Sequence, residues 1–332
     1  MLNNKSILIT GGTGFFGKNF VRYIYKKYKP ARVVIFSRDE AKQFEMRNEF
    51  TKEKYKKLKF FIGDVRDKDR LMMAFDDIDY VVHAAALKHV PAAEYNPIET
   101  IKTNIYGAEN VIQASINCGV EKVIALSTDK AANPINIYGA TKLASDKLFI
   151  AANNLVGRKK TRFSVVRYGN VFNSRGSVVP YFNELVAKGK KELPVTDIKM
   201  TRFVISIAKG IELVLKSFQR MHGGEVFVPK LSSIRITDLV KAISPKIKYK
   251  IIGIRPGEKM HEILCPSDSS HLTYEFKDHY LISPGIQFHT SKNKFNKNKS
   301  NEVGKLVKNG FEYQSGNNKK FLKIGEIKKL LK

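Results

Sequence analysis

Short apolar runs alternate with amphipathic stretches through the first half of the chain. Runs typical of buried strands cover residues 6–10, 32–36, 59–62, 79–83, 123–126 and 161–167. The stretches between them have the apolar spacing of helices, including one expected over residues 39–57. Strands that alternate with helices favour a parallel sheet covered on both faces, with right-handed crossovers. The pattern therefore predicts an α/β fold built on a doubly wound parallel sheet.

The regular alternation ends after residue 167. Short strands, Gly and Pro punctuation and isolated helices follow, with helices expected over 207–221 and 236–243. Residues 289–305 are rich in Lys and Asn and predict a loop, and a regular pattern returns over 311–332. This second half suits a smaller lobe laid over the carboxyl edge of the sheet.

A glycine-rich turn follows the first apolar run directly. Its spacing is Gly-x-x-Gly-x-x-Gly, and a helical segment to about Tyr28 comes next. Such glycines allow a tight turn and a close approach to a pyrophosphate, and the helix N-terminus offers free N–H groups. The turn predicts a Rossmann-type dinucleotide site, and a purely structural turn is the alternative. The contacts expected here are Gly11, Thr13, Gly14, Phe15, Phe16 and Gly17.

The end of the second predicted strand bears on the choice of dinucleotide. An acidic residue there would bind the ribose 2′-hydroxyl of NAD. Ser37 and Arg38 occupy this place, and Lys42 follows one turn later, a set that suits the 2′-phosphate of NADP. We therefore predict NADP, although Asp39 is close enough to leave NAD as an alternative.

Residues after the third and fourth predicted strands extend this site. Asp64 is placed to accept from the adenine amino group, unless Asp64 or Asp67 caps the next helix. The small residues Ala84, Ala85 and Ala86 would let a flat cofactor pass close to the backbone.

Tyr138 and Lys142 lie four residues apart in the long helical segment after residues 127–136. On a helix they share one face. A phenol with a pKa near ~10 is a poor base, but an ammonium group one turn away should lower that pKa. Tyr138 could then take a proton from a hydroxyl while a nicotinamide takes the hydride. Two unrelated residues on an amphipathic helix are the alternative.

Composition excludes several classes of protein. The chain has 332 residues, 43% hydrophobic and 27% charged, as in ordinary globular proteins. It has no apolar run of membrane-spanning length, and a strand so near Met1 leaves no room for a signal peptide. Cys118 and Cys265 are its only cysteines, and Cys265 stands where a zinc motif at His261-Glu262 would need its second His. We expect a cytoplasmic protein with no metal and no membrane contact.

The net charge of +28 favours an anionic partner. However, Lys outnumbers Arg by 45 to 14, whereas phosphate-reading surfaces favour the Arg fork. Residues 287–332 alone hold twelve Lys against three Glu, with no nucleic-acid-binding motif beside them. We interpret the excess as solvated surface charge that attracts an anionic substrate, and we expect no nucleic acid.

Longer motifs cover almost the whole chain. They are residues 64–67, 83–91, 127–134, 167–171, 174–177, 200–203, 255–259 and 311–315, with Asn318. With the glycine turn and Tyr138-x-x-x-Lys142, they resemble the extended short-chain dehydrogenase/reductases that act on nucleotide sugars. Within that family they are similar to the inverting UDP-N-acetylglucosamine 4,6-dehydratases of pseudaminic acid biosynthesis. The Lys-rich stretch before residue 311 departs most from this pattern.

The resemblance implies a redox-neutral reaction. Tyr138 takes the C4 hydroxyl proton as hydride passes to NADP, water leaves C6, and the hydride returns to C6. Thr128 hydrogen-bonds near the C4 oxygen, Asp129 protonates the departing C6 hydroxyl, and Lys130 acts at C5, which is reprotonated from the opposite face. The product would be UDP-2-acetamido-2,6-dideoxy-β-L-arabino-hexos-4-ulose. Relatives that retain the C5 configuration carry Glu in place of Lys130, whose pKa burial should lower towards base function.

The resemblance also implies a set of ligand contacts. Those for substrate are Lys88, Lys130, Asn170, Arg175, Val178, Thr196, Met200, Arg202, Arg255, Glu258 and Asn318. Arg255, with Arg202 as a second candidate, suits the pyrophosphate; alternatively, Arg202 pairs with an acid and Glu258 orients Arg255. The remaining cofactor contacts expected are Val65, Lys88, Ser127, Tyr138, Lys142, Asn170 and Val171.

Residues 1–169 are therefore expected to form the NADP-binding domain with the catalytic residues. Residues 170–332 would form mainly the substrate-binding lobe, interleaved with elements that return to the sheet. A UDP-sugar 4-epimerase, or a related dehydratase and epimerase for capsule or O-antigen sugars, is the nearest alternative. A non-catalytic NADP sensor is a distant one. Family behaviour implies a homo-oligomer, with a hexamer as one option, and leaves flagellin or capsule glycosylation open as the pathway.

Overall fold

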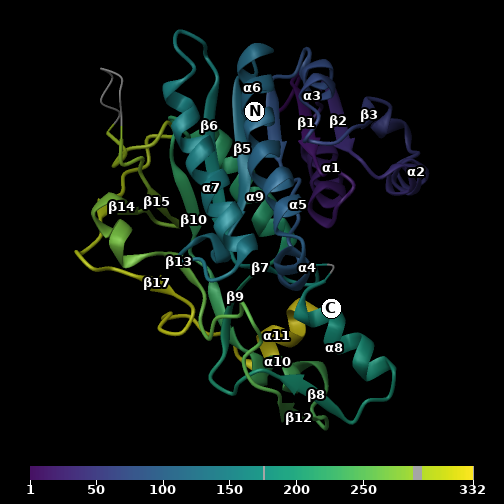
Figure 1. The fold of residues 1–332 in the computed structure, drawn as a ribbon, viewed down its shortest axis with the longest axis vertical. Coiled ribbons are helices and arrows are strands. Elements are labelled where there is room, and N and C mark those ends of the chain that lie inside the picture. Colours follow the sequence, from purple (N-terminus) through teal and green to yellow (C-terminus); the bar gives the residue numbers. More distant parts are fainter. Residues whose placement is uncertain (175, 287–293, 332) are drawn as a thin grey trace.

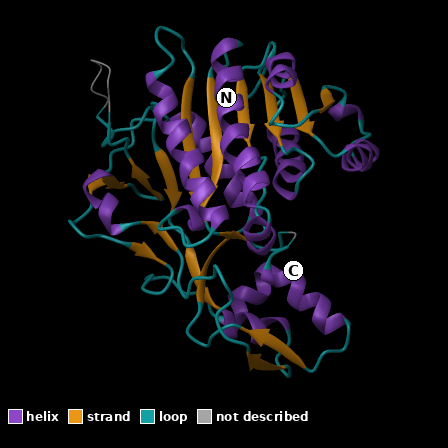
Figure 2. Cartoon of the chain, viewed as in Figure 1, coloured by secondary structure: helices purple, strands orange, loops and turns teal. Residues whose placement is uncertain are grey.

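A computed structural model describes residues 1–174, 176–286 and 294–331. Its main feature is a ten-stranded sheet in the order β16-β14-β15-β10-β6-β5-β4-β1-β2-β3, with helices on both faces (Figures 1 and 2). From β10 to β3 neighbouring strands are parallel, whereas the strands from β16 to β10 pair antiparallel. The order β3-β2-β1-β4-β5-β6 is that of the doubly wound Rossmann fold. The predicted fold class is confirmed.

The predicted strands of the first half all form, each within two residues of its expected bounds. They read as continuous apolar runs because helices cover both faces of the sheet. The ten strands are β1 (Ser6–Thr10), β2 (Arg32–Ser37), β3 (Leu58–Ile62), β4 (Tyr80–His83), β5 (Lys122–Thr128), β6 (Arg162–Tyr168), β10 (Val226–Pro229), β14 (Thr273–Glu275), β15 (His279–Ile282) and β16 (Lys305–Leu306).

Helices from distant parts of the chain cover the two faces. On one face α1 (Phe15–Lys27) contacts α9 (Ile207–Arg220), which Figure 1 draws behind the sheet. On the other face α6 (Gly107–Asn117) contacts both α3 (Lys68–Phe75) and α7 (Ile137–Ala151). Shorter helices are α2 (Glu40–Glu49), α4 (Val90–Tyr95) and α5 (Pro97–Ile101).

One predicted helix was too long. The segment expected over residues 39–57 forms α2 and then a separate 3-10 turn at Glu53–Tyr55. Phe50 ends the helix because its ring is buried and packs edge-on against Tyr55. The chain folds back there to reach β3.

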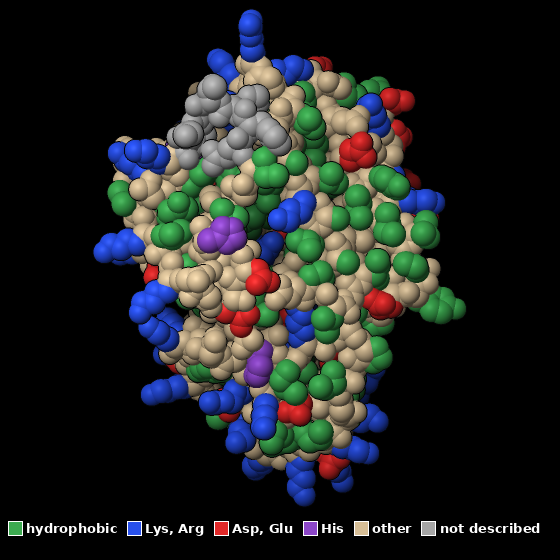
Figure 3. Space-filling view, turned by 60° about the vertical axis from the view of Figure 1, so that its left-hand side comes forward, with side chains coloured by type: hydrophobic (Ala, Val, Ile, Leu, Met, Phe, Trp, Pro, Cys, Tyr) green, Lys and Arg blue, Asp and Glu red, His purple; other side chains and the backbone are tan. Residues whose placement is uncertain are grey.

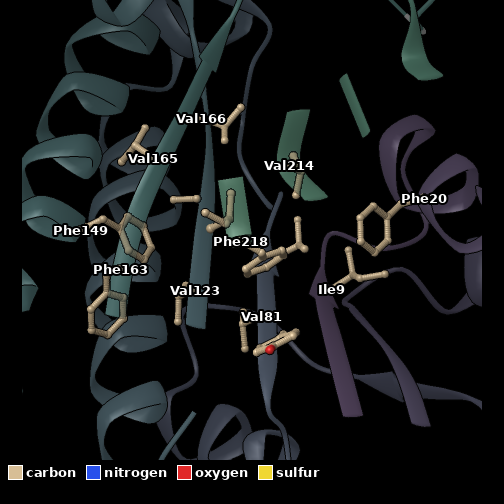
Figure 4. Close-up of a cluster of buried hydrophobic side chains, with 14 of the residues drawn as sticks. Ile9, Phe20, Val81, Val123, Phe149, Phe163, Val165, Val166, Val214 and Phe218 are labelled. Carbon is tan, nitrogen blue, oxygen red and sulfur yellow. The ribbon is translucent and has the colours of Figure 1, made fainter. Parts of the chain in front are cut away.

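The main core lies between the sheet and its helices (Figure 4). Ile9, Val81 and Val123, on neighbouring strands, are fully buried. Phe20 of α1 and Phe218 of α9 close over the sheet from the helices. Burying a side chain of this size contributes about 1.5–3 kcal/mol, so this layer fixes the strand ends that carry the site.

A smaller lobe lies at the carboxyl end of the sheet, at the bottom of Figure 1. Its strands are β7 (Asn170–Val171), β9 (Thr201–Ile205) and β11 (Ser232–Arg235) in one sheet, the pair β8 (Glu192–Val195) and β12 (Lys248–Ile251), and the pair β13 (Ile263–Cys265) and β17 (Tyr313–Gln314). Its helices are α8 (Val178–Ala187), α10 (Ile236–Ile243) and α11 (Ile324–Leu331). A second core that includes Phe182, Leu239 and Ile327 holds its helices together, whereas Leu264, Cys265 and Tyr313 of the β13–β17 pair belong to the main core.

The second half of the chain serves both parts of the molecule. The predicted helices at 207–221 and 236–243 form α9 and α10, and β10, β14, β15 and β16 return to the main sheet. Of the predicted loop at 289–305, residues 289–293 lie outside the described residues. The rest forms turns, a bridge between Lys297 and Val303, and the first residue of β16. In Figure 3 Lys and Arg side chains gather at the lower end of the molecule, over the smaller lobe.

Candidate active site

The glycine-rich turn lies between the end of β1 and the start of α1. Gly11 has a φ of +64°, and a Cβ there would lie 2.9 Å from the Cα of Ala85. At Gly17 a Cβ would lie 2.1 Å from the carbonyl oxygen of Gly12, closer than any side chain allows. Gly14 is the N-cap of α1 and has no side chain to cap it, which leaves N–H groups for a phosphate. The turn therefore fits a dinucleotide.

The residues expected at the 2′-phosphate differ in exposure and in the partners that they already have. The Ser37 hydroxyl is buried and accepts a hydrogen bond from Gln43 Nε2 at 3.1 Å. Asp39 caps α2 by accepting from the Lys42 N–H at 3.0 Å, and it also pairs with the Lys42 ammonium. The Arg38 side chain is 56% exposed, with Nη1 3.6 Å from Asp64 Oδ2. Of the two predicted cations, Arg38 and Lys42, Arg38 is thus the more accessible.

The segments that follow β3 and β4 lie at the carboxyl edge of the sheet, as the glycine turn does. Asp64 accepts hydrogen bonds from the backbone and guanidinium groups of Arg66, while Asp67 caps α3. The N–H groups of Ala84 and Ala85 donate to Thr10 Oγ1 at 3.2 and 3.3 Å. The predicted small-residue loop therefore lies beside the glycine turn.

Asn104 is a positioning residue that the sequence did not suggest. It lies in a π-helical turn, Lys102–Tyr106, and is 1% exposed. Its side chain accepts from the N–H of Leu87 at 2.8 Å and donates to the Leu87 carbonyl at 2.9 Å and to Thr141 Oγ1 at 3.0 Å. It thereby joins the loop that carries Lys88 to α7. An Asn inside a helical stretch is too common a signal to have identified it.

The catalytic candidates lie where β5 passes into α7. Thr128 ends β5, Asp129–Ala131 forms a 3-10 turn, and Asn136 caps α7 by accepting from the Gly139 N–H at 2.7 Å. Tyr138 and Lys142 then lie in the first two turns of α7, and both are buried. Their predicted helical spacing is confirmed.

The pKa predicted for Tyr138 was wrong in direction. Burial raises the pKa of Tyr138 to about 12, although the Lys130 charge and a hydrogen bond with Thr128 lower it. Burial likewise lowers the pKa of Lys142, although the carboxylate of Asp146 raises it. Because neither group faces water, desolvation outweighs the single neighbouring charge on which the prediction relied.

Lys130 lies between two buried carboxylates. Its Nζ is 3.0 Å from Asp129 Oδ1 and 3.2 Å from Glu262 Oε1. Burial alone would lower the pKa of Lys130, but Asp129 and Glu262 raise it above its ordinary value. The predicted lowering was therefore wrong, because it considered burial without the opposing charges of Asp129 and Glu262. Burial raises the pKa of Asp129 despite the Lys130 charge, which suits a carboxyl group that gives up a proton.

A second buried network of hydrogen bonds joins α7 to neighbouring strands. Asp146 Oδ2 accepts from Ser127 Oγ at 2.7 Å and from Arg167 Nη2 at 3.0 Å. Arg167 Nη1 also donates to the Leu264 carbonyl at 3.2 Å. The helix that carries Tyr138 is thereby joined to β5, β6 and β13.

The two predicted arginines are not alike. Arg202 is buried on β9, where Nη1 donates to the carbonyls of Thr201 and Met260 and Nε lies 3.6 Å from Glu262 Oε1. The alternative that Arg202 pairs with an acid is therefore correct. Arg255 is half-exposed, with Nη1 3.9 Å from Glu258 Oε1.

Glu258 also joins two other predicted residues. It accepts from Thr196 Oγ1 at 3.2 Å, so Thr196, Arg255 and Glu258 lie together. Lys259, next to Glu258, donates to the carbonyl of Ala132 at 2.7 Å. This holds the 255–259 loop of the smaller lobe against the segment that carries Lys130.

A small cavity of about 10 Å³ brings other predicted residues together, since its lining includes Asn170, Val171, Val178 and Arg202. A larger hollow of about 390 Å³ lies at the far edge of the sheet, between α2 and β3. Its lining contains none of the predicted site residues. The chemistry of the side chains, and not this hollow, therefore places the site.

Two predicted substrate contacts are held within the smaller lobe, and a third lies outside the described residues. Met200 is buried just before β9, where its carbonyl accepts from the Ile236 N–H. Asn318 Nδ2 donates to Ser233 Oγ and the Leu231 carbonyl, both at 3.0 Å, which holds the tail on β11. Arg175 lies outside the described residues.

Two wider properties concern the described part of the chain. Within residues 1–174, 176–286 and 294–331, no group of three or more His, Cys, Asp or Glu could hold a metal ion. Across the same residues, no helix combines the length and apolar character needed to cross a bilayer.

The arrangement agrees with what similar proteins show. A family model described as polysaccharide biosynthesis protein matches residues 7–284. The chain belongs to this family. One similar protein is UDP-N-acetylglucosamine 4,6-dehydratase (inverting) of Campylobacter jejuni subsp. jejuni serotype O:2. It is 60% identical over 318 residues, which cover 96% of this chain and 94% of the relative. The predicted resemblance is confirmed.

Two further comparisons define the breadth of this polysaccharide biosynthesis protein family. UDP-glucose 4-epimerase of Rickettsia bellii is 45% identical over 291 residues, covering 85% of this chain and 84% of the relative. The X-ray structure of Pen from Bacillus thuringiensis superposes with a TM-score of 0.88 and 36% identity, covering 100% of this chain and 98% of the other. The family thus includes relatives named for two different reactions on one scaffold.

Proposed function

We propose that the protein is a UDP-N-acetylglucosamine 4,6-dehydratase that inverts C5. The observation that carries the proposal is the position of Lys130, 3.0 Å from Asp129 and in electrostatic contact with Tyr138. This set supplies a proton-transfer group at each of the three positions, C4, C5 and C6, at which the reaction acts. The relative at 60% identity, which bears that enzyme's name, supports the same substrate.

We assign each side chain one role in the reaction. Tyr138 takes the C4 hydroxyl proton, with Thr128 bonded to the phenol and near the same oxygen. Asp129, whose pKa burial raises, gives its proton to the departing C6 hydroxyl. Lys130 acts at C5, whose hydrogen the 4-keto group makes acidic. Lys142, on the same helix face as Tyr138, completes the set.

The cofactor proposed for this site is NADP. When bound, it would accept the hydride from C4 and supply it again to C6. The glycine turn, the helix N-terminus at Gly14 and the loop at Ala84–Ala86 would hold it, and Arg38 would bind the 2′-phosphate. Residues 1–169 would thus bind cofactor, and the lobe within 170–332 would bind the UDP-sugar through Arg255 and its neighbours.

The product would be UDP-2-acetamido-2,6-dideoxy-β-L-arabino-hexos-4-ulose, a precursor suited to pseudaminic acid and flagellin glycosylation. Cytoplasmic location, expected from the composition of the chain, and homo-oligomerisation, implied by the resemblance, stay predictions. A 4-epimerase is the second candidate, because one relative at 45% identity bears that name. Lys130 favours the dehydratase, since epimerisation at C4 needs no group at C5.

The test is proton NMR of the protein with UDP-N-acetylglucosamine and NADP in deuterated water. We expect a new 6-methyl signal beside a 4-keto or hydrated carbon, deuterium at C5 and couplings of the arabino ring. The 4-epimer, or unchanged substrate, would contradict the proposal.

A matched pair of variants tests Lys130. Lys130→Ala should lower turnover by about 10²–10⁴-fold, the usual contribution of a proton-transfer group, and should keep NADP affinity. Lys147→Ala removes an exposed lysine from the same segment and should leave turnover unchanged. Near-normal turnover in Lys130→Ala would remove Lys130 from the mechanism.

A further inference from the structure

Glu262 is a buried acid that the proposed reaction has not yet used. Its side chain is 3% exposed, and Oε1 lies 3.2 Å from Lys130 Nζ and 3.6 Å from Arg202 Nε. It precedes β13 directly and so comes from the smaller lobe, while Lys130 belongs to the Rossmann part. The ion pair therefore crosses between the two parts of the molecule.

The backbone of Glu262 is fixed on both sides. Its N–H donates to Ser315 Oγ at 2.9 Å, and the Ser315 N–H donates to the Glu262 carbonyl at 2.8 Å. Ser315 Oγ is itself 2.8 Å from Thr201 Oγ1, which lies 2.8 Å from His261 Nδ1. These bonds fix the backbone that carries the Glu262 carboxylate beside the ammonium group of Lys130.

Lys130 is more exposed than the two carboxylates that it contacts. Its side chain is 25% exposed, against 1% for Asp129 and 3% for Glu262. The charged and titratable groups that face it are Asp129, Glu262, Arg202, Tyr138 and Lys259. Of these, Glu262 favours the ammonium form, as does Asp129 once it has given up its proton, and the two cations oppose it. Without Glu262, one carboxylate would face both cations.

We propose that Glu262 is a positioning residue, which holds Lys130 as an ammonium ion at the cleft so that Lys130 delivers the proton to C5. This inference rests on the proposed function and assigns the direction of the proton transfer. One N–H bond of Lys130 breaks and its electron pair stays on nitrogen. The enolate pair forms the C5–H bond, and the C4 carbonyl is restored. The resulting amine then regains a proton from water through the exposed part of its side chain.

The variant Glu262→Gln keeps the shape of the side chain and removes its charge. We expect kcat to fall by about tenfold or more with KM within about twofold, the signature of an interaction needed in the reaction and not in binding. The alkaline limb of the kcat profile should also move to lower pH, because Lys130 loses a carboxylate that keeps it protonated. A merely structural Glu262 would change the amount of folded enzyme and leave that limb in place.

Two further variants complete the experiment. Glu312→Gln makes the same change beside β17, the strand paired with β13, where Glu312 accepts from Gln314; it should match wild type. Glu262→Asp keeps the charge and should retain the wild-type pH limb at a reduced rate, even if Glu262→Gln fails to fold. An unshifted limb in Glu262→Gln, or the same shift in Glu262→Asp, would overturn the inference.

The wild-type protein separates this inference from the proposed function. If it forms no 4-keto product, the proposed function fails. If it forms the product and Glu262→Gln retains wild-type kcat and pH profile, only the role of Glu262 fails.

Discussion

At the scale of single residues, burial changes the chemistry more than residue type does. The types and spacing of Thr128, Asp129, Lys130 and Tyr138 could be predicted, because they lie in one continuous segment. The directions of two pKa shifts could not. Burial raises the pKa of Tyr138, and Glu262, from a distant part of the chain, raises that of Lys130. A single acid directly before the apolar run Ile263–Cys265 was the signal that could have found Glu262.

Arg38 gives a prediction about cofactor choice. Arg38→Ala should weaken NADP binding by about tenfold or more, since hydrogen bonds to charged groups contribute about 1.5–3 kcal/mol. NAD, which lacks the 2′-phosphate, should keep its affinity within about twofold. Calorimetric titration of both dinucleotides measures the difference. Arg47→Ala removes an exposed positive charge from the other end of α2 and serves as the control; equal losses for both dinucleotides in Arg38→Ala would contradict the assignment.

At the scale of elements, the packing of α1 against the turn after β1 leaves no room for a side chain at Gly17. Gly17→Ala would place a Cβ against the Gly12 carbonyl, so the turn must shift at a cost of about 1–3 kcal/mol. We expect a lower Tm and weaker dinucleotide binding. Gly325→Ala, in α11, meets no atom within 4 Å and should be neutral or stabilising by about 0.5–1 kcal/mol. Thermal melts with and without NADP compare the two, and similar melts would show that the turn adapts.

Elements were predictable where one local signal decided them. The strands of the first half were found because each is a short apolar run between breakers. The end of α2 was missed because Phe50 is buried by a tertiary contact with Tyr55 and not by any local breaker. The π-helical turn around Asn104 was missed for a similar reason, since its side-chain bonds go to Leu87 and Thr141.

At the scale of the whole molecule, the class of fold could be predicted from the sequence, but the way in which the second half of the chain packs on the first could not. Alternating strands and helices identified the Rossmann sheet, but no local pattern indicated that β14 and β16 would join its edge. Nor could the sequence show that Arg202 faces Glu262 inside the protein. Both depend on how the second half folds back over the first. The contacts between the two parts therefore matter most for the site.

Asn136 makes one such contact and gives the last prediction. Its Oδ1 caps α7, while its Nδ2 donates to the Gly257 carbonyl at 2.8 Å, in the loop that carries Arg255. Asn136→Ser should keep the cap, because Ser and Asn cap equally well, and should lose the bond to Gly257. We expect KM for UDP-N-acetylglucosamine to rise several-fold while stability falls by only about 0.5–1.5 kcal/mol.

Asn136→Ala is the matched comparison, because it loses the bond to Gly257 and the cap together. Its stability should fall by about 0.5–2 kcal/mol more than that of Asn136→Ser, with a similar KM. Steady-state kinetics and urea unfolding separate the two effects. If Asn136→Ser kept the wild-type KM, the loop at Arg255 would hold its place without Asn136, and Lys259, bonded to Ala132, would be the contact that joins the two parts at the site.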